Sequence, residues 1–138
     1  MPRNMNVKSH GIDMVECARL RQMADRHGQR FLKRVFTPAE LKYCMGKKRR
    51  IEHLAGRFAA KEAVLKVLGT GWRSGINWTD IEIRNAPSGQ PSVHLSGRCR
   101  QIARKIGLTD ILVSISHIET HAIASAIGLT GVRRRQKG

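Results

Sequence analysis

A glutamate on the apolar side of a helix is the residue of this sequence that points most clearly to chemistry. In a helix predicted over residues 48–68, each residue advances by about 100°, so apolar side chains gather on one stripe. That stripe is formed by Leu54, Ala55, Phe58, Glu62 and Leu65. A carboxylate that faces a core is costly unless it gains a cation, a hydrogen-bond network or a raised pKa. Glu62 is therefore a candidate ligand or base.

Two structural explanations of Glu62 compete with the functional one. Lys66 follows one helical turn later, so the two side chains could form an ion pair contributing a few tenths of a kcal/mol. Alternatively, Glu62 could lie at the edge of the stripe and reach water, with Lys61 flanking it from the side. The small residues around it favour function, because they would let a ligand approach. They are Ala59, Ala60 and Ala63.

Asp13 is the second candidate carboxylate, because it ends the first predicted strand after Gly11 and Ile12. It could equally cap the helix that follows. If Asp13 and Glu62 converge beside a diphosphate, they would suit Mg²⁺, which prefers oxygen ligands and often keeps substrate phosphates and waters in its shell.

His117 is a third candidate, at the end of a strand. It shares one face of that strand with Ile111, Val113 and Ile115, because side chains alternate along a strand. A histidine in this position is structural more often than catalytic. His121, just across the predicted turn, is an alternative carrier of any role.

A basic run precedes the long helix, and it consists of Lys47, Lys48, Arg49 and Arg50. Together with Arg57 it forms either a solvated face or a clamp for phosphate. The backbone N–H groups of Gly69 and Gly71 could also face a phosphate, although helix capping explains Gly69 equally well.

The composition is strongly basic, with 26 Lys and Arg against 10 Asp and Glu and a formal net charge of +16. Such a charge attracts nucleic acid, anionic lipid, phosphorylated small molecules or an acidic protein, and charge alone favours nucleic acid. The three cysteines show no disulfide or zinc spacing. Neither a membrane span nor the apolar core of a signal peptide is found, so we expect a cytoplasmic protein.

Helices and antiparallel hairpins follow each other along the chain in an order that predicts an α+β fold rather than a wound parallel sheet. The predicted strands cover residues 7–15, 80–85, 92–95, 111–118 and 121–129. The predicted helices cover residues 16–26, 48–68 and 97–106, the first ending at Gly28. A further helix starts with a capping box formed by Thr37 and Glu40. We expect one domain over residues 1–132 and a basic tail over 133–138.

These segments together resemble the holo-acyl-carrier-protein synthases. The resemblance is carried, in order, by Gly11-Ile12-Asp13, by Phe36 to Glu40, by the block from Arg57 to Lys66, by Gly69-Thr70-Gly71, by Asp80 to Ile83, by Gly89-Gln90-Pro91, and by Val113 to His117. It covers about residues 7–129. It implies a compact phosphopantetheinyl transferase domain, an antiparallel sheet packed with one long helix and shorter helices, and a homotrimer with sites between subunits. Neither nucleic acid nor a membrane is an implied partner.

The resemblance also implies roles for the candidate residues. Asp13 and Glu62 would bind Mg²⁺ with the diphosphate of coenzyme A, Lys66 would contact the phosphate under attack, and His117 would come from the neighbouring subunit. The coenzyme would be bound by Lys47, Lys48, Arg49, Arg50, Arg57, Lys66, Gly69 and His117. An acidic apo-acyl carrier protein would dock on Arg19, Met23, Arg26 and Phe31.

The implied reaction moves phosphopantetheine to a serine of the carrier and releases adenosine 3′,5′-bisphosphate, in support of fatty acid biosynthesis. Either Glu62 or a metal-bound water would deprotonate the serine. The sequence departs from many relatives at Ile118, which stands where they carry a hydroxyl residue after the Ser-His pair. Any hydrogen bond of that hydroxyl is therefore absent.

Overall fold

The computed structural model describes residues 5–72 and 75–131 and confirms the α+β class. The predicted tail, residues 133–138, lies outside this part. The strands are β1 (Met5–Glu16), β2 (Ile81–Asn85), β3 (Pro91–Leu95), β4 (Asp110–His117) and β5 (His121–Gly131). The helices are α1 (Cys17–Val35), α2 (Pro38–Met45), α3 (Arg50–Leu68) and α4 (Gly97–Lys105), with a short 3₁₀ turn η1 (Trp78–Asp80).

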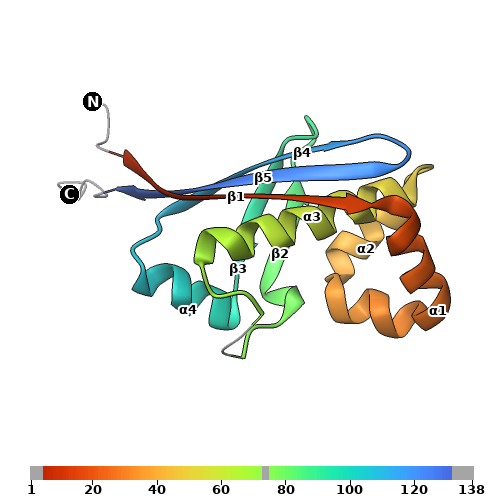
Figure 1. Cartoon of the computed structure of the whole chain (residues 1–138), viewed down its shortest axis with the longest axis horizontal. Coiled ribbons are helices and arrows are strands. Elements are labelled where there is room, and N and C mark those ends of the chain that lie inside the picture. Colours follow the sequence, from red (N-terminus) through yellow and green to blue (C-terminus); the bar gives the residue numbers. More distant parts are fainter. Residues whose placement is uncertain (1–4, 73–74, 132–138) are drawn as a thin grey trace.

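A three-stranded antiparallel sheet with the order β1-β5-β4 lies along the long helix α3 (Figure 1). Small side chains on β5 allow the helix to approach, since Ala122, Ala124 and Ala126 are all buried. Gly11 of β1 is required for the same reason, because a side chain there would collide with the carbonyl oxygen of Ala63. The consequence is that β1 runs in direct contact with the middle of α3.

The two predicted hairpins are confirmed. Strands β2 and β3 pair with each other, and β4 pairs with β5 through a turn at Glu119 and Thr120. The turn is closed by the N–H of Ile118, which donates to the carbonyl of His121 at 2.8 Å. The hairpin places His117 opposite Ala122, at the end of the sheet where α3 begins.

The first helix is longer than predicted, because it does not end at Gly28. The backbone breaks there, with φ 56° and ψ −138°, and helix then resumes as far as Val35. The added turns carry Phe31 and Leu32, which are buried in a cluster with Phe36 and Leu54. Burial of this apolar side gives the chain a reason to resume helix after the break.

Within residues 5–72 and 75–131, no helix is long and apolar enough to cross a membrane. The three cysteines are free and buried. Burial raises the pKa of Cys44 to about 11 and that of Cys99 to about 12, so both stay protonated thiols near neutral pH.

Candidate active site

Asp13 and Glu62 meet in one cavity of about 510 Å³, where β1 passes over α3. The contact at Gly11, two residues before Asp13, explains the meeting, because it holds β1 against the helical turn that follows Glu62. The cavity is lined by Asp13, Met14, Val15, Glu16, Arg19, Leu20, Met23, Phe58, Glu62 and His121. It is therefore part acidic and part apolar.

Glu62 is half-buried, and burial is the main cause that raises the pKa of its carboxyl above the ordinary value. The nearby carboxylate of Asp13 raises this pKa further. A hydrogen bond from Trp72 and the charge of Lys66 act in the opposite direction. Two carboxylates in one cavity disfavour each other unless a cation lies between them, so the electrostatics suit a positively charged ligand.

Lys66 pairs with Asp13 rather than with Glu62. Its Nζ lies 3.6 Å from Oδ1 of Asp13 and donates to the carbonyl of Ile12 at 2.6 Å. In the described part of the chain no ion pair joins Lys66 to Glu62, so the simple helical pair considered from the sequence is wrong. Lys66 remains 54% exposed, which leaves its ammonium accessible to an anion.

His117 lies in a second cluster at the N-terminal end of α3. Its Nδ1 is 2.9 Å from Oε1 of Glu52, and its ring meets that of His53 at 5.0 Å between centroids. Glu52 precedes Glu62 by ten residues, which corresponds to about 15 Å along the helix. Within one chain, His117 is therefore apart from the two carboxylates, whereas His121 lines their cavity.

The basic residues divide between two places. Lys47 and Arg57 both lie over the ring of Tyr43, and Arg57 also donates to the side-chain oxygen of Asn85. Arg57 is only 3% exposed, and its Nε is buried without a hydrogen-bond partner among the described residues. The other three line a separate cavity beside α1, and they are Lys48, Arg49 and Arg50.

Gly69 caps α3, which decides between the two explanations given for it. It has a left-handed conformation, with φ 78°, and its N–H donates to the carbonyl of Leu65 at 2.9 Å. This N–H is therefore engaged in the helix cap and is not available to a phosphate.

The residues predicted to dock a carrier protein do not all lie on one surface. Arg19 and Met23 line the cavity of the two carboxylates, and Arg26 is exposed further along α1. Phe31 is 8% exposed and packs inside the cluster that holds α1 against α3. The predicted place of Phe31 on the docking surface is therefore wrong, because its ring packs in the core.

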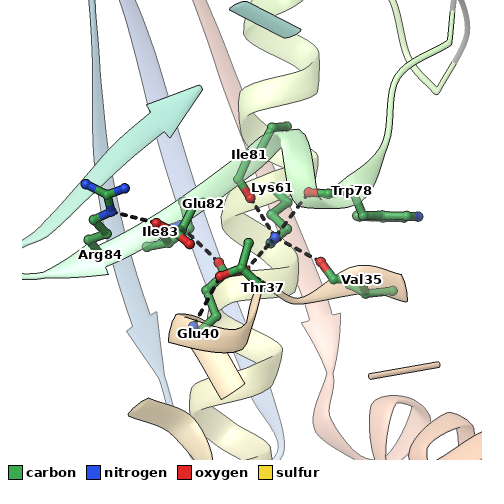
Figure 2. Close-up of polar contacts among 9 residues, drawn as sticks. All are labelled: Val35, Thr37, Glu40, Lys61, Trp78, Ile81, Glu82, Ile83 and Arg84. Atoms are coloured by element: carbon green, nitrogen blue, oxygen red, sulfur yellow. Dashed lines mark hydrogen bonds and ion pairs between the residues drawn. The ribbon is translucent and has the colours of Figure 1, made fainter. Parts of the chain in front are cut away.

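Sequence reasoning did not find the buried ion pair between Glu40 and Lys61, which Figure 2 shows. The capping box is confirmed, because Glu40 Oε1 accepts from the N–H of Thr37 at 2.9 Å. The same oxygen lies 2.7 Å from Nζ of Lys61, which is 0% exposed. A signal was present: Lys61 follows Leu54 by seven residues, so it lies near the apolar stripe and needs a buried partner.

Comparison with known proteins defines the class first. The model of the 4′-phosphopantetheinyl transferase superfamily matches residues 9–125, which is most of the chain.

Similar proteins identify the family within this superfamily. The holo-[acyl-carrier-protein] synthase of Koribacter versatilis is 45% identical, over 85% of this chain and 94% of that protein. The synthase of Moorella thermoacetica is 50% identical, over 86% of this chain and 90% of that protein. Among solved structures, the synthase of Neisseria meningitidis gives a TM-score of 0.82 at 28% identity, covering 89% of this chain and 98% of that one. The synthase of Helicobacter pylori in complex with coenzyme A gives a TM-score of 0.77 at 32% identity, covering 87% of this chain and 99% of that one. The chain therefore belongs to the holo-[acyl-carrier-protein] synthase family.

Proposed function

We propose that this chain transfers the phosphopantetheine arm of coenzyme A to a serine of an apo-acyl carrier protein. The observation that carries the proposal is the meeting of Asp13 and Glu62 in one cavity, in a chain of this family. Coenzyme A as substrate is supported by the Helicobacter pylori relative, whose structure contains it. We place the reaction in the cytoplasm, in support of fatty acid biosynthesis.

The two carboxylates fit a magnesium ion. Mg²⁺ is usually held by one or two protein carboxylates together with substrate phosphates and waters. Among the described residues there is no group of three or more His, Cys, Asp or Glu that could hold a metal, so substrate oxygens would have to complete the shell. When bound, the ion would neutralise the diphosphate of coenzyme A. We propose Asp13 and Glu62 as its protein ligands.

Glu62 and Lys66 would both assist the transfer. The serine oxygen bonds to the phosphorus that bears pantetheine, and the bond to adenosine 3′,5′-bisphosphate breaks. We propose that the serine proton passes to Glu62, whose carboxylate lies in the same cavity as that of Asp13. Lys66, beside Asp13, offers positive charge to the transferring phosphate.

We also propose a homotrimer whose sites are completed between subunits. The outer face of the three-stranded sheet supports association, because exposed apolar side chains alternate there with the inward ones. They are Ile12, Met14, Leu112 and Ile123. The cluster around His117 and Arg57 is separated from the carboxylates within one chain, which suits its pairing with the carboxylates of another subunit. In that role His117, Lys47 and Arg57 would contact the coenzyme.

Reversing the charge of Arg19 is expected to weaken carrier binding, because Arg19 lies on α1 at the rim of the carboxylate cavity. For Arg19→Glu we expect the KM for the carrier to rise about tenfold and its salt dependence to flatten, since interface charges act mainly on association. The KM for coenzyme A should change by less than about twofold. Steady-state kinetics with each substrate varied in turn measures both.

Arg104→Glu is the matched control, because it changes the net charge equally. It lies on α4, at the opposite end of the molecule from α1 (Figure 1). An equal rise in the KM for the carrier in the two variants would show that carrier binding depends only on total charge.

The proposed function has a direct test. The purified chain is incubated with coenzyme A, Mg²⁺ and an apo-acyl carrier protein, and the intact carrier is weighed by mass spectrometry. We expect the carrier to gain the mass of one phosphopantetheine group, and to gain nothing without coenzyme A. An unchanged carrier mass, together with tight binding of the chain to nucleic acid, would favour the function suggested by the net charge of +16 alone.

A further inference from the structure

Trp72 makes a specific contact with the carboxylate at the centre of the cavity. Its indole Nε1–H donates to Oε1 of Glu62 at 3.3 Å. Trp72 follows α3 after two glycines in left-handed conformations, with φ 78° at Gly69 and φ 60° at Gly71. These conformations reverse the chain, so a residue ten positions later lies back on the helical turn that carries Glu62.

A ring stack holds Trp72 in this place. Its ring lies 3.5 Å from that of Trp78 between centroids, and the ring of Trp78 lies 4.8 Å from that of Phe58 on α3. The chain has only these two tryptophans. Trp72 is therefore held by ring stacking as well as by its hydrogen bond to Glu62.

The buried lysine next to Glu62 anchors the backbone of Trp78, the middle residue of this stack. Nζ of Lys61 donates to the carbonyl of Trp78 at 3.1 Å and to that of Ile81 at 2.6 Å, as Figure 2 shows. Lys61 is itself held by Glu40. Thus two neighbouring helical residues act on one segment: Lys61 fixes the backbone of Trp78, and Glu62 receives the indole of Trp72.

We propose that Trp72 is a positioning residue for Glu62, and this inference rests on the proposed function. An indole can only donate, so it fixes Oε1 in one direction and leaves Oε2 free for the cation or the serine proton. A half-buried carboxylate beside Asp13 would otherwise rotate toward water and away from its neighbour.

The test compares two variants that make the same replacement in the same stack. Trp72→Phe keeps a ring but loses the donor to Glu62. Trp78→Phe also keeps a ring, and it leaves the indole of Trp72 in place as the donor to Glu62. We expect kcat to fall about tenfold in Trp72→Phe, the order expected for one hydrogen bond to a charged group. The KM for coenzyme A should stay within about twofold, and Trp78→Phe should lose clearly less kcat than Trp72→Phe.

Equal loss of kcat in the two variants would overturn the proposal, because the stack would then act only as packing. A change in the KM for coenzyme A with an unchanged kcat would also overturn it. An inactive wild-type enzyme would count against the proposed function instead, and the contact needs a readout that does not depend on activity.

That readout is the fluorescence of the Trp78→Phe chain, in which Trp72 is the sole tryptophan. Acrylamide quenching reports how firmly its ring is held. Adding Glu62→Leu removes the acceptor and should increase quenching, whereas Glu62→Gln keeps an acceptor oxygen and should leave quenching close to that of the Trp78→Phe chain. Identical quenching in the Leu and Gln variants would show that the indole is not held by Glu62 and would contradict the proposal, whatever the enzyme's activity.

Discussion

Glu62→Gln is expected to lower kcat by about 10³-fold or more without unfolding the chain. The substitution removes one negative charge from the proposed magnesium site and the group proposed to accept the serine proton. General base assistance alone is typically worth about 10²–10⁴-fold. Glutamine keeps the shape of the side chain and an oxygen for the indole of Trp72, so the local packing is retained.

Without metal, the Glu62→Gln chain should be at least as stable as the wild type at neutral pH. Burial and Asp13 raise the pKa of Glu62 in the folded chain, so its ionised form costs folding free energy at a pH above that raised value. An uncharged amide avoids this cost. Thermal unfolding in the presence of EDTA measures it, alongside kcat from the carrier-mass assay.

Glu16→Gln is the matched control, because Glu16 lines the same cavity but makes no capping hydrogen bond at the start of α1. It should retain most of the wild-type kcat. Full activity in Glu62→Gln, or an equal loss in both variants, would remove the specific role of Glu62.

Lys61→Met is expected to destabilise the fold by about 3–5 kcal/mol, the usual cost of leaving one partner of a buried ion pair alone. Glu40 is 1% exposed, so its carboxylate would stay buried without a cation. The carbonyls of Val35, Trp78 and Ile81 would lose their shared donor as well. Urea unfolding at pH 7 measures the change in the free energy of unfolding.

The control makes the same substitution about one turn further along α3. Lys66 is 54% exposed, and exposed ion pairs contribute at most about 1 kcal/mol, so Lys66→Met should cost little stability. Replacing both members of the buried pair, in Lys61→Met with Glu40→Leu, should recover part of the loss. A cost below about 1 kcal/mol for Lys61→Met alone would show that the pair does not stabilise the fold.

The secondary structure could largely be predicted from the sequence because its signals are local. Alternating side chains and turn residues mark both hairpins, and Thr37 with Glu40 marks the start of α2. The extension of α1 beyond Gly28 could not be found this way, since it depends on burying Phe31 against α3. The same burial explains why Phe31 was wrongly expected on the surface.

Glu62 was singled out from helical spacing, Asp13 from its place at the end of the first strand, and both from the family resemblance, but the partners of the buried and polar residues were not predicted. Lys61 pairs with Glu40, and His117 with Glu52, across distances of 21 and 65 residues in the sequence. Trp72 reaches Glu62 only because the chain reverses after α3. Such contacts depend on tertiary packing, which spacing along one helix does not encode.

We propose that Asp13 and Glu62 jointly bind one divalent cation together with coenzyme A. Titration with Mn²⁺ in the presence of coenzyme A, followed by electron paramagnetic resonance, tests it directly by counting bound ions and giving their Kd. We expect Asp13→Asn and Glu62→Gln each to raise the Kd about tenfold or more, equivalent to about 1.4 kcal/mol, while Glu16→Gln leaves it unchanged. Mn²⁺ binding that is the same in all four proteins would contradict the account.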